Sequence, residues 1–288
     1  MKRIISAIFV LSVCLSLSAQ GGKVFDNLSV KSKILKMERN FAIYLPPDYE
    51  TSGRSYPVLY LLHGMGDDHS GWIQFGEVKH IADKAIAEGA ATSMIVVMPD
   101  ANTKQVGYYN HPEGSYDYEK FFFEELIPHV EKTYRCRTEK RFRAIAGLSM
   151  GGSGTLVYAL HRPDLFAAAC PLSAAMCHTD GFDAMRSHYA RLSPNKSEED
   201  IKTWWAENYD ILELVKIVSE ENLKAVRWYI DCGDDDFLTE GNALLHIAML
   251  DKKIPHEFRM RDGAHTWSYW RESLPEVLRF ISESFHQK

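Results

Sequence analysis

Cysteine is scarce in this sequence and is not arranged for metal or redox chemistry. The 288 residues include five cysteines, and no two of them form a C-x-x-C motif. This excludes the paired-cysteine spacing of zinc sites and of thioredoxin-like redox centres. The four cysteines beyond the N-terminal segment allow three disulfide pairings, between which the sequence does not choose. We expect mostly unpaired thiols among these four, which are Cys136, Cys170, Cys177 and Cys232. Cys170 and Cys232 lie in or beside predicted buried strands, where a free thiol packs as a small hydrophobic side chain.

A basic cluster and a second long apolar run are also missing. Lysine and arginine total 33 against 39 aspartate and glutamate residues, which gives a net charge of −6 and a pI near 6.1. Without a basic stretch we expect no nucleic-acid partner. Beyond the N-terminal segment no apolar run reaches the roughly 20 residues that span a bilayer, so we expect no stable membrane insertion after the leader is removed. The sequence leaves the oligomeric state open.

The N-terminal segment has the pattern of a secretory signal peptide. A positively charged start precedes an apolar stretch over residues 4–17, and small residues lead to a predicted cleavage after Ala19. The apolar stretch is short for a retained membrane anchor. Cys14 is a poor lipoprotein site, because Val13 stands where a small residue is needed. We therefore expect a signal peptide at residues 1–19 and a secreted or periplasmic protein.

Strand and helix patterns alternate along the rest of the chain. Continuous apolar runs at residues 56–62 and 94–98 are typical of strands buried on both faces, as in a parallel sheet. Residues 78–88 and 118–132 have helical spacing. The same reasoning predicts further strands at 41–45, 141–146, 167–172, 226–231 and 256–260, and further helices at 155–161, 242–250 and 267–285. The alternation predicts a single α/β domain over residues 20–288 with a doubly wound, mainly parallel sheet.

Residues 177–223 interrupt this alternation. The stretch is polar, and it contains the adjacent pair Trp204 and Trp205. Because it lies between two predicted strands, we interpret it as a helical, lid-like insertion over the carboxyl ends of the sheet, where open α/β sheets bind ligands. A surface insertion without a role in binding is the alternative.

The strongest chemical signal is the pentapeptide Gly147-Leu148-Ser149-Met150-Gly151. A predicted strand precedes it and a predicted helix follows it, which is the setting of a nucleophile elbow. In such an elbow the flanking glycines allow a sharp turn that lifts one serine hydroxyl clear of the sheet. A glycine-rich turn with a solvated serine has the same pattern, so the interpretation depends on the partners of the serine.

A nucleophilic serine needs a base, and in this chain order the base is a late histidine. His265 lies in a loop between the last predicted strand and the last predicted helix, so we expect it to be the base for Ser149. Three other late histidines fall in a helix, at a strand start and in the tail, where packing or solvation explains them: His246, His256 and His286.

The acid that orients the base is expected in the loop after the preceding strand, and that strand is predicted at residues 226–231. An acidic run follows that strand, and we predict Asp236 as the acid because Phe237 and Leu238 anchor its loop. Asp235 is the alternative.

The oxyanion of the reaction needs two backbone N–H donors. One is predicted from Met150, the residue after the nucleophile. The other is predicted from Met65 in the glycine-containing loop at residues 63–66, with Gly64 as the alternative.

A group of histidines and aspartates within residues 63–69 suggests a metal site at first sight. Metal-dependent hydrolases with a related pattern need histidines at the positions where glycines 64 and 66 stand. We therefore expect neither a metal nor another cofactor.

Four segments resemble the esterase D-like family of α/β-hydrolases, which includes feruloyl and acetylxylan esterases of carbohydrate esterase family 1, S-formylglutathione hydrolases and mycolyltransferases. These segments are residues 61–66, 147–152, 231–238 and 263–267, and residues 118–131 are similar to the segment before the elbow. The resemblance covers roughly residues 30–285. It implies the α/β-hydrolase fold, with Ser149 as nucleophile, Asp236 as acid and His265 as base.

The resemblance implies a serine carboxylesterase, and the signal peptide favours an exported enzyme that removes feruloyl or acetyl groups from plant polysaccharide or oligosaccharide. Its partner is then an ester-bearing small molecule or oligosaccharide. Removal of feruloyl groups implies an aromatic slot in the substrate site. The candidates for this slot are Trp72, Trp204, Trp205 and Trp270. The alternative is that each of these tryptophans packs in the core or the lid. The competing functions are an acyltransferase that uses the same residues and a non-catalytic carbohydrate-binding protein. A peptidase is disfavoured, because the chain carries no added propeller-type domain.

Overall fold

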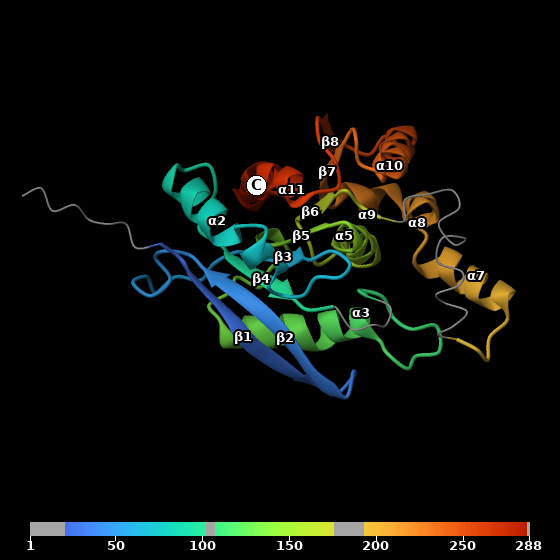
Figure 1. Cartoon of the computed structure of the whole chain (residues 1–288), viewed down its shortest axis with the longest axis horizontal. Helices are drawn as coiled ribbons and strands as arrows, with labels where there is room; N and C mark the ends of the chain where they lie inside the picture. Colours follow the sequence, from blue (N-terminus) through green and yellow to red (C-terminus); the bar gives the residue numbers. More distant parts are fainter. Residues whose placement is uncertain (1–20, 102–106, 176–192, 287–288) are drawn as a thin grey trace, which may run out of the picture.

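The computed structural model describes residues 21–101, 107–175 and 193–286 (Figure 1). Its centre is an eight-stranded sheet in the order β1-β2-β4-β3-β5-β6-β7-β8. The first two strands, β1 (Lys23–Ser32) and β2 (Met37–Leu45), run antiparallel to each other, and β2 is antiparallel to β4. All later neighbours pair in parallel. The parallel strands are β3 (Val58–Leu62), β4 (Ile95–Pro99), β5 (Arg143–Leu148), β6 (Ala168–Leu172), β7 (Arg227–Gly233) and β8 (His256–Arg261).

The central strands are apolar throughout because both of their faces are covered. In β3 every residue is buried, and successive side chains enter opposite cores. Val58, Tyr60 and Leu62 join one hydrophobic cluster, whereas Leu59 and Leu61 join the other. This is the expected consequence of the two-residue period of a strand between two helical layers. The prediction of a doubly wound, mainly parallel sheet is confirmed.

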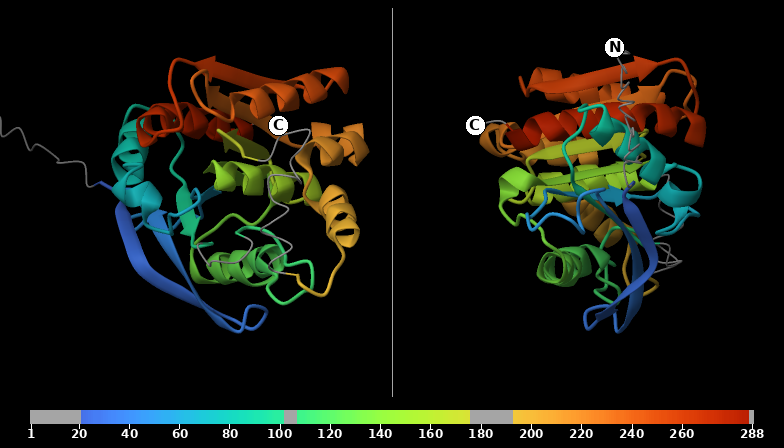
Figure 2. Two further views of the ribbon diagram at one scale, coloured as in Figure 1. Left: turned by 45° about the vertical axis from the view of Figure 1, so that its right-hand side comes forward. Right: turned by 90° about the vertical axis from the view of Figure 1, so that its left-hand side faces the viewer.

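Two layers of helices cover the sheet (Figure 2). One face packs against α1 (Gly71–Gln74), α2 (Val78–Ala87) and α11 (Trp267–His286). The helices that contribute to the core on the other face are α3 (Tyr118–Phe121), the π-helical η1 (Phe122–Leu126), α4 (Ile127–Thr133), α5 (Met150–His161), α7 (Glu198–Asn208), α8 (Ile211–Ile217), α9 (Glu220–Lys224) and α10 (Thr239–Asp251). A short 3₁₀ turn, η2 (Lys140–Phe142), precedes β5. Among the residues described, no helix combines the length and the apolar character needed to cross a bilayer.

Three observed elements differ from the predictions. Strand β1 was not predicted, because most of its residues are exposed and an irregularity in its register interrupts the apolar alternation. Helix α5 begins at Met150 rather than at residue 155, so its first turns contain Gly151, Gly152 and Gly154, which lie before the predicted start of the helix. The predicted helix at residues 118–132 is present, but its middle turn is π-helical.

The predicted insertion at residues 177–223 is described from residue 193 onward. Its helices α7, α8 and α9 lie between β6 and β7 in the chain, and α8 packs against α5 and α10. The described part therefore extends a helical layer. Residues 177–192 lie outside the described residues, so the covering role of this segment stays a prediction.

Two other predictions involve residues outside the described part of the chain. The signal peptide at residues 1–19 belongs to them, as does Cys177. Three cysteines of the described residues are free: Cys136, Cys170 and Cys232. Two of them, Cys170 in β6 and Cys232 in β7, are buried in strands as predicted.

Candidate active site

The turn between β5 and α5 holds Ser149 in a backbone conformation that L-residues rarely adopt. Its φ is 53° and its ψ is −116°. The glycines around it permit close packing: a Cβ on Gly147 would lie 2.5 Å from the carbonyl oxygen of Gly151, and one on Gly151 would lie 2.6 Å from that of His63. The N–H of Ser149 donates to the carbonyl of Leu172 at the end of β6, at 2.9 Å. Strain of this kind, held by the surrounding chain, is characteristic of a functional turn.

The structure brings Ser149, His265 and Asp236 into one hydrogen-bonded row. The Nδ1–H of His265 donates to Oδ2 of Asp236 at 2.8 Å. Its Nε2 lies 3.0 Å from Oγ of Ser149, a residue 116 positions earlier in the chain. Because an ionised carboxylate only accepts hydrogen bonds, Asp236 selects the tautomer whose Nε2 accepts the serine proton. The three side chains come from the loops that follow β5, β7 and β8.

The carboxylate of Asp236 is buried, with 4% of the residue exposed. Burial by itself opposes its ionisation. Hydrogen bonds from His265, from the N–H of Leu238 and from the hydroxyl of Ser173 outweigh burial and hold the pKa of Asp236 below its usual range. Asp235 is exposed, so the structure separates the two acids between which the sequence left a choice.

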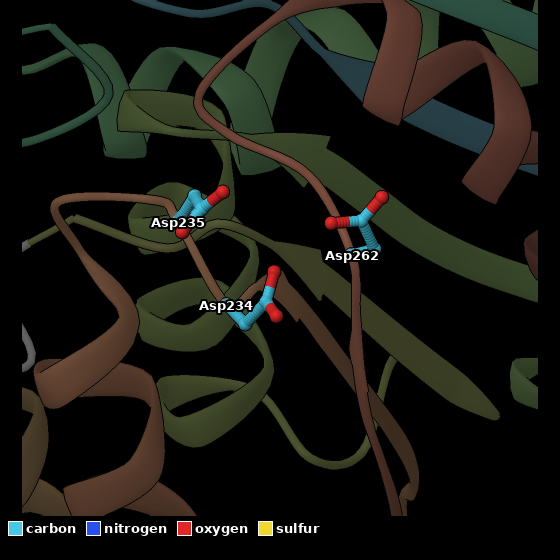
Figure 3. A group of neighbouring side chains, drawn as sticks. All are labelled: Asp234, Asp235 and Asp262. Atoms are coloured by element: carbon cyan, nitrogen blue, oxygen red, sulfur yellow. The ribbon is translucent and has the colours of Figure 1, made fainter.

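Three exposed carboxylates lie beside this row, on the loops that carry the acid and the histidine (Figure 3). They belong to Asp234, Asp235 and Asp262, and their oxygens lie within 4.8 Å of one another. Oδ1 of Asp234 accepts from the N–H of Gly263, and the N–H of Asp235 donates to the carbonyl of Gly263, both at 3.0 Å. These bonds join the two loops and so fix the acid relative to the histidine.

The loop after β3 lies against the elbow. A Cβ on Gly64 would lie 3.6 Å from Cβ of Ser149. The N–H of Asp67 donates to the carbonyl of Gly64 at 3.3 Å, which closes a turn with Gly66 at a φ of 85°. The N–H of Asp67 makes this turn bond, and the N–H of Met65 takes no part in it. Met65 itself is 75% exposed. The arrangement is compatible with the predicted oxyanion donor Met65, which stays a prediction.

The second predicted donor, Met150, is the first residue of α5. Its N–H therefore belongs to the unpaired donors at a helix N-terminus, where the helix dipole favours negative charge. Its side chain packs near Gly107, at which a Cβ would lie 2.9 Å from Sδ of Met150. Its donor role is likewise a prediction.

His63 supports the loop after β3, a role that the sequence did not indicate. Its Nδ1–H donates to the carbonyl of Gly64 at 2.7 Å, and its Nε2 accepts from the N–H of Ala101 at 2.9 Å. Burial lowers the pKa of His63, which keeps the imidazole in the neutral form that this pair of bonds requires. The hydroxyl of Tyr108 also contacts the backbone of His63, accepting from its N–H at 2.8 Å. Both ring nitrogens are thus engaged by backbone groups and are not free to bind a metal.

Two of the four predicted substrate-binding tryptophans lie in the core instead. Trp72 has no exposed surface, and its Nε1–H donates to the carbonyl of Leu62 at 2.9 Å. Trp205 is 1% exposed and packs edge-on against Tyr109. A tryptophan is readily buried where its apolar rings pack against other side chains. The predicted contact of Trp72 and Trp205 with substrate is therefore corrected: both are packing residues.

The other two tryptophans have different surroundings. Trp204 is partly buried, with its ring 5.0 Å from that of Tyr209. Trp270 is buried and meets the imidazole of His265 edge-on, with ring centroids 4.8 Å apart. It is thus beneath the histidine rather than at an open surface, and its predicted contact with substrate is also corrected. Among the described residues, Phe237 is an exposed aromatic residue beside the site: it is 75% exposed, and its ring lies 4.6 Å from that of His265.

Comparison with known proteins places this geometry in a family. The profile of the Esterase family, described as "Putative esterase", matches residues 32–281. The chain belongs to this family. This esterase is also similar to a solved structure of a ferulic acid esterase, with a TM-score of 0.80 and 35% identity over 92% of this chain and 99% of that one.

Curated relatives agree with the family. An esterase of Mycobacterium tuberculosis is 37% identical over 155 residues, and an endo-1,4-β-xylanase/feruloyl esterase of Xylanibacter ruminicola is 37% identical over 133 residues. These matches cover 52% and 43% of this chain but 32% and 18% of the relatives, so the chain spans under a third of their length. The S-formylglutathione hydrolase of Mus musculus is 28% identical over 285 residues, covering 89% of this chain and 92% of that protein.

The family and the fold are those that the sequence motifs implied. The chain is an esterase D-like α/β-hydrolase. The predicted family and fold are confirmed.

Proposed function

We propose that this esterase is an exported serine carboxylesterase that hydrolyses feruloyl or acetyl esters of plant polysaccharide or oligosaccharide. Ser149 is its nucleophile, His265 its general base and Asp236 the acid that orients the base. The observation that supports these roles is the continuous row of hydrogen bonds from the serine hydroxyl through the imidazole to a buried carboxylate. Such a row converts a weakly nucleophilic hydroxyl into one that attacks a carbonyl.

In the first half of the reaction, Oγ of Ser149 forms a bond to the carbonyl carbon of the ester. Nε2 of His265 takes the hydroxyl proton, and the carbonyl becomes an oxyanion that accepts from the N–H groups of Met150 and Met65. The tetrahedral intermediate collapses, its bond to the leaving oxygen breaks, and His265 protonates that oxygen. Asp236 stabilises the imidazolium present between these two proton transfers.

The second half repeats these steps with water. His265 takes a proton from the water as its oxygen bonds to the acyl carbon. The intermediate then releases Oγ of Ser149, which recovers its proton from His265. Each oxyanion donor contributes about 3–4 kcal/mol to stabilising such intermediates in hydrolases of known mechanism.

The proposed substrate class is supported by the names of similar proteins. The similar solved structure is of a ferulic acid esterase, and the relative from Xylanibacter ruminicola joins a feruloyl esterase to a xylanase. An acetyl esterase of Caldicellulosiruptor saccharolyticus matches 88% of this chain at 22% identity. Export is supported by the pattern at residues 1–19, which predicts a mature chain that begins at Gln20.

Phe237 is a further candidate for an aromatic contact with substrate, beside Trp204, whose predicted contact stays a proposal. Its ring lies against the imidazole that protonates the leaving oxygen, so a group attached to that oxygen passes close to it. An exposed aromatic ring is a suitable surface for the apolar face of a sugar or for an aryl group.

The experiment measures hydrolysis of acetyl, butyryl, feruloyl and cinnamoyl esters, and of S-formylglutathione as a further substrate. The proteins compared are the secreted chain, the variant Ser149→Ala and the exposed control variant Ser55→Ala. We expect hydrolysis of feruloyl or acetyl esters, loss of it in Ser149→Ala with the fold retained, and no change in the control. Labelling by a fluorophosphonate probe should disappear in Ser149→Ala alone.

Other outcomes identify the competing functions. Acyl transfer to an added sugar in preference to water indicates an acyltransferase. The absence of both turnover and probe labelling indicates a carbohydrate-binding protein. Turnover that persists in Ser149→Ala rejects the proposed nucleophile.

A further inference from the structure

A second buried carboxylate lies on β7, shortly before Asp236 in the chain. Asp231 has no exposed surface, so its charge is withdrawn from water and needs hydrogen-bond donors from the protein. Three side chains supply them. Nη2 of Arg261 donates to Oδ2 at 2.9 Å, the hydroxyl of Tyr229 donates to the same oxygen at 3.0 Å, and the hydroxyl of Tyr269 donates to Oδ1. None of these four residues takes part in the proposed proton transfers.

Two of the three donors lie at opposite ends of the loop that carries the base. This loop runs over residues 262–266, between β8 and α11, and contains His265. Arg261 is the last residue of β8, and Tyr269 lies in the first turn of α11. One carboxylate on the neighbouring strand therefore ties both ends of the loop. Tyr229 differs from these two donors, because it belongs to β7 itself and its bond ties no part of the loop.

Further contacts of Tyr269 fix the same corner. Nη2 of Arg261 also donates to Oγ of Ser273, and the hydroxyl of Ser273 donates to the carbonyl of Tyr269 at 3.0 Å. The ring of Tyr269 packs on Gly263, where an added Cβ would lie 2.5 Å from Cδ2 of the ring. Gly263 has a φ of 141°, so the absence of a side chain permits both the turn and the contact. Tyr269 thus holds the loop by its ring as well as by its hydroxyl.

The loop in turn determines where the imidazole lies. Gly263 precedes His265 by two residues, and its N–H and carbonyl bond to Asp234 and Asp235 on the loop that carries the acid (Figure 3). In this arrangement Nε2 of His265 lies 3.0 Å from Oγ of Ser149. A shift of about 1 Å in such a contact can cost roughly 100-fold in rate, so the reaction depends on where the loop is held.

We propose that Asp231 is a positioning residue for the base His265, and that it acts by tying both ends of the loop at residues 262–266 through Arg261 and Tyr269. The proposal rests on the proposed role of His265 in ester hydrolysis. The three residues act on the reaction through the loop and the histidine. Loss of either tie lets the loop move and lengthens the contact between Nε2 of His265 and Oγ of Ser149, whereas substrate binding is unaffected.

The test compares Tyr269→Phe with the matched control Tyr229→Phe. Each variant removes one hydroxyl from the same buried carboxylate and keeps its ring, so urea titrations should show similar losses of unfolding free energy. Only Tyr269→Phe cuts a tie to the loop. On an ester that the wild type hydrolyses, we expect its kcat to fall about ten-fold, the equivalent of one hydrogen bond to a charged group, with KM unchanged. Tyr229→Phe should keep the kcat of the wild type.

A proton resonance reports the position of the base without any substrate. A proton on imidazole Nδ1 that is bonded to a carboxylate resonates far downfield of the amide protons, and His265 makes such a bond to Asp236. Its resonance should broaden or vanish in Tyr269→Phe and persist in Tyr229→Phe. His161 also meets a carboxylate through Nδ1, and its resonance is an internal reference that should persist in both variants. The signal that disappears in Asp236→Asn is assigned to His265.

A second variant, Arg261→Met, cuts the tie at the other end of the loop. Methionine is unbranched and flexible and lacks the donor that reaches Asp231. We expect kcat and the resonance of His265 to change in the same direction as in Tyr269→Phe. If Tyr269→Phe does not fold, Arg261→Met takes its place in the comparison with Tyr229→Phe.

Two results overturn the proposal. One is an equal kcat in the two tyrosine variants, because the two hydroxyls then either act through the stability of the fold alone or have no effect on the reaction. The other is an unchanged resonance of His265 in Tyr269→Phe while kcat falls. Failure of the proposed function is separate: the wild-type chain then hydrolyses no ester of the panel, and the resonance still tests whether Asp231 positions the histidine.

Discussion

At the scale of single residues, burial distinguishes two neighbouring carboxylates, of which we propose the buried one as the catalytic acid. Asp236 accepts hydrogen bonds from a histidine and a backbone N–H, whereas Asp235 is exposed at the surface. A carboxylate that stays ionised and fixed in position can hold the imidazole in one tautomer. A solvated carboxylate holds that tautomer less firmly. The identity of the acid thus follows from its surroundings.

This difference predicts opposite results for two similar substitutions. Asp236→Asn should lower kcat by about 10⁴, because an amide can donate to Nδ1 and select the wrong tautomer. Asp235→Asn should leave kcat within about two-fold, since exposed charges contribute little. Steady-state kinetics on one acetyl ester measures both. Equal losses in the two variants would contradict the assignment of the acid.

The three side chains of the hydrogen-bonded row could be predicted from the sequence, whereas the packing around them could not. Ser149, Asp236 and His265 follow from chain order and from the ends of predicted strands, because an α/β sheet places those ends together. Trp72 was misjudged because a sequence does not reveal whether an aromatic ring faces solvent. The support that His63 gives its loop depends on Ala101, which is distant in sequence and carries no motif.

At the scale of elements, the elbow depends on the contact between α5 and the end of β3. Gly151→Ala would place a methyl group 2.6 Å from two carbonyl oxygens, those of Leu62 and His63. We expect the variant to lose about 1–3 kcal/mol of unfolding free energy, and its activity with it, because backbone must move to relieve the clash.

The control for this substitution is Gly53→Ala, where a Cβ meets nothing within 4 Å. Chemical denaturation of both variants measures the difference. A Gly151→Ala variant as stable as the control would show that the elbow adapts to a side chain.

Regular elements were predicted where one physical signal dominates. The buried strands and α11 were predicted close to their observed ends, because their apolar patterns are continuous or strongly periodic. Strand β1 and the π-helical turn η1 were missed, because tertiary contacts determine them. Glu125 in η1 accepts from the N–H groups of Lys33 and Ile34 in the turn between β1 and β2, and only the folded chain shows this.

At the scale of the whole molecule, a polar cluster joins three helical segments. Nδ1 of His161, at the end of α5, lies 2.7 Å from Oε1 of Glu119 in α3. The hydroxyl of Tyr209, just after α7, donates to Oε2 of Glu119 at 3.0 Å. Burial of His161 opposes its protonation, but the hydrogen bond and the charge of Glu119 raise its pKa above the ordinary value of 6.5. Protonation of this histidine is thereby coupled to the packing of the helices.

The coupling predicts how stability depends on pH. Because the pKa of His161 is raised by folding, its contribution is fully present below about pH 6.5 and is lost as pH rises through the folded-state pKa. His161→Gln should therefore lower the urea midpoint more at about pH 5.5 than at about pH 9. Urea titrations of the wild type and the variant at both values test this. A difference that grows with pH would reverse the sign and contradict the coupling.

Within the part of the chain that the structure describes, β1 and β8 are the two edge strands of the sheet. An open edge attracts the strands of other molecules, and native proteins oppose this with irregular backbone and charge. Strand β1 shifts its register between Phe25 and Leu28, and β8 carries the ion pair of Glu257 with Arg259. Two copies that approach edge to edge meet a bent backbone on one side and charged groups on the other. The molecule is thereby protected from polymerising into a continuous β-structure.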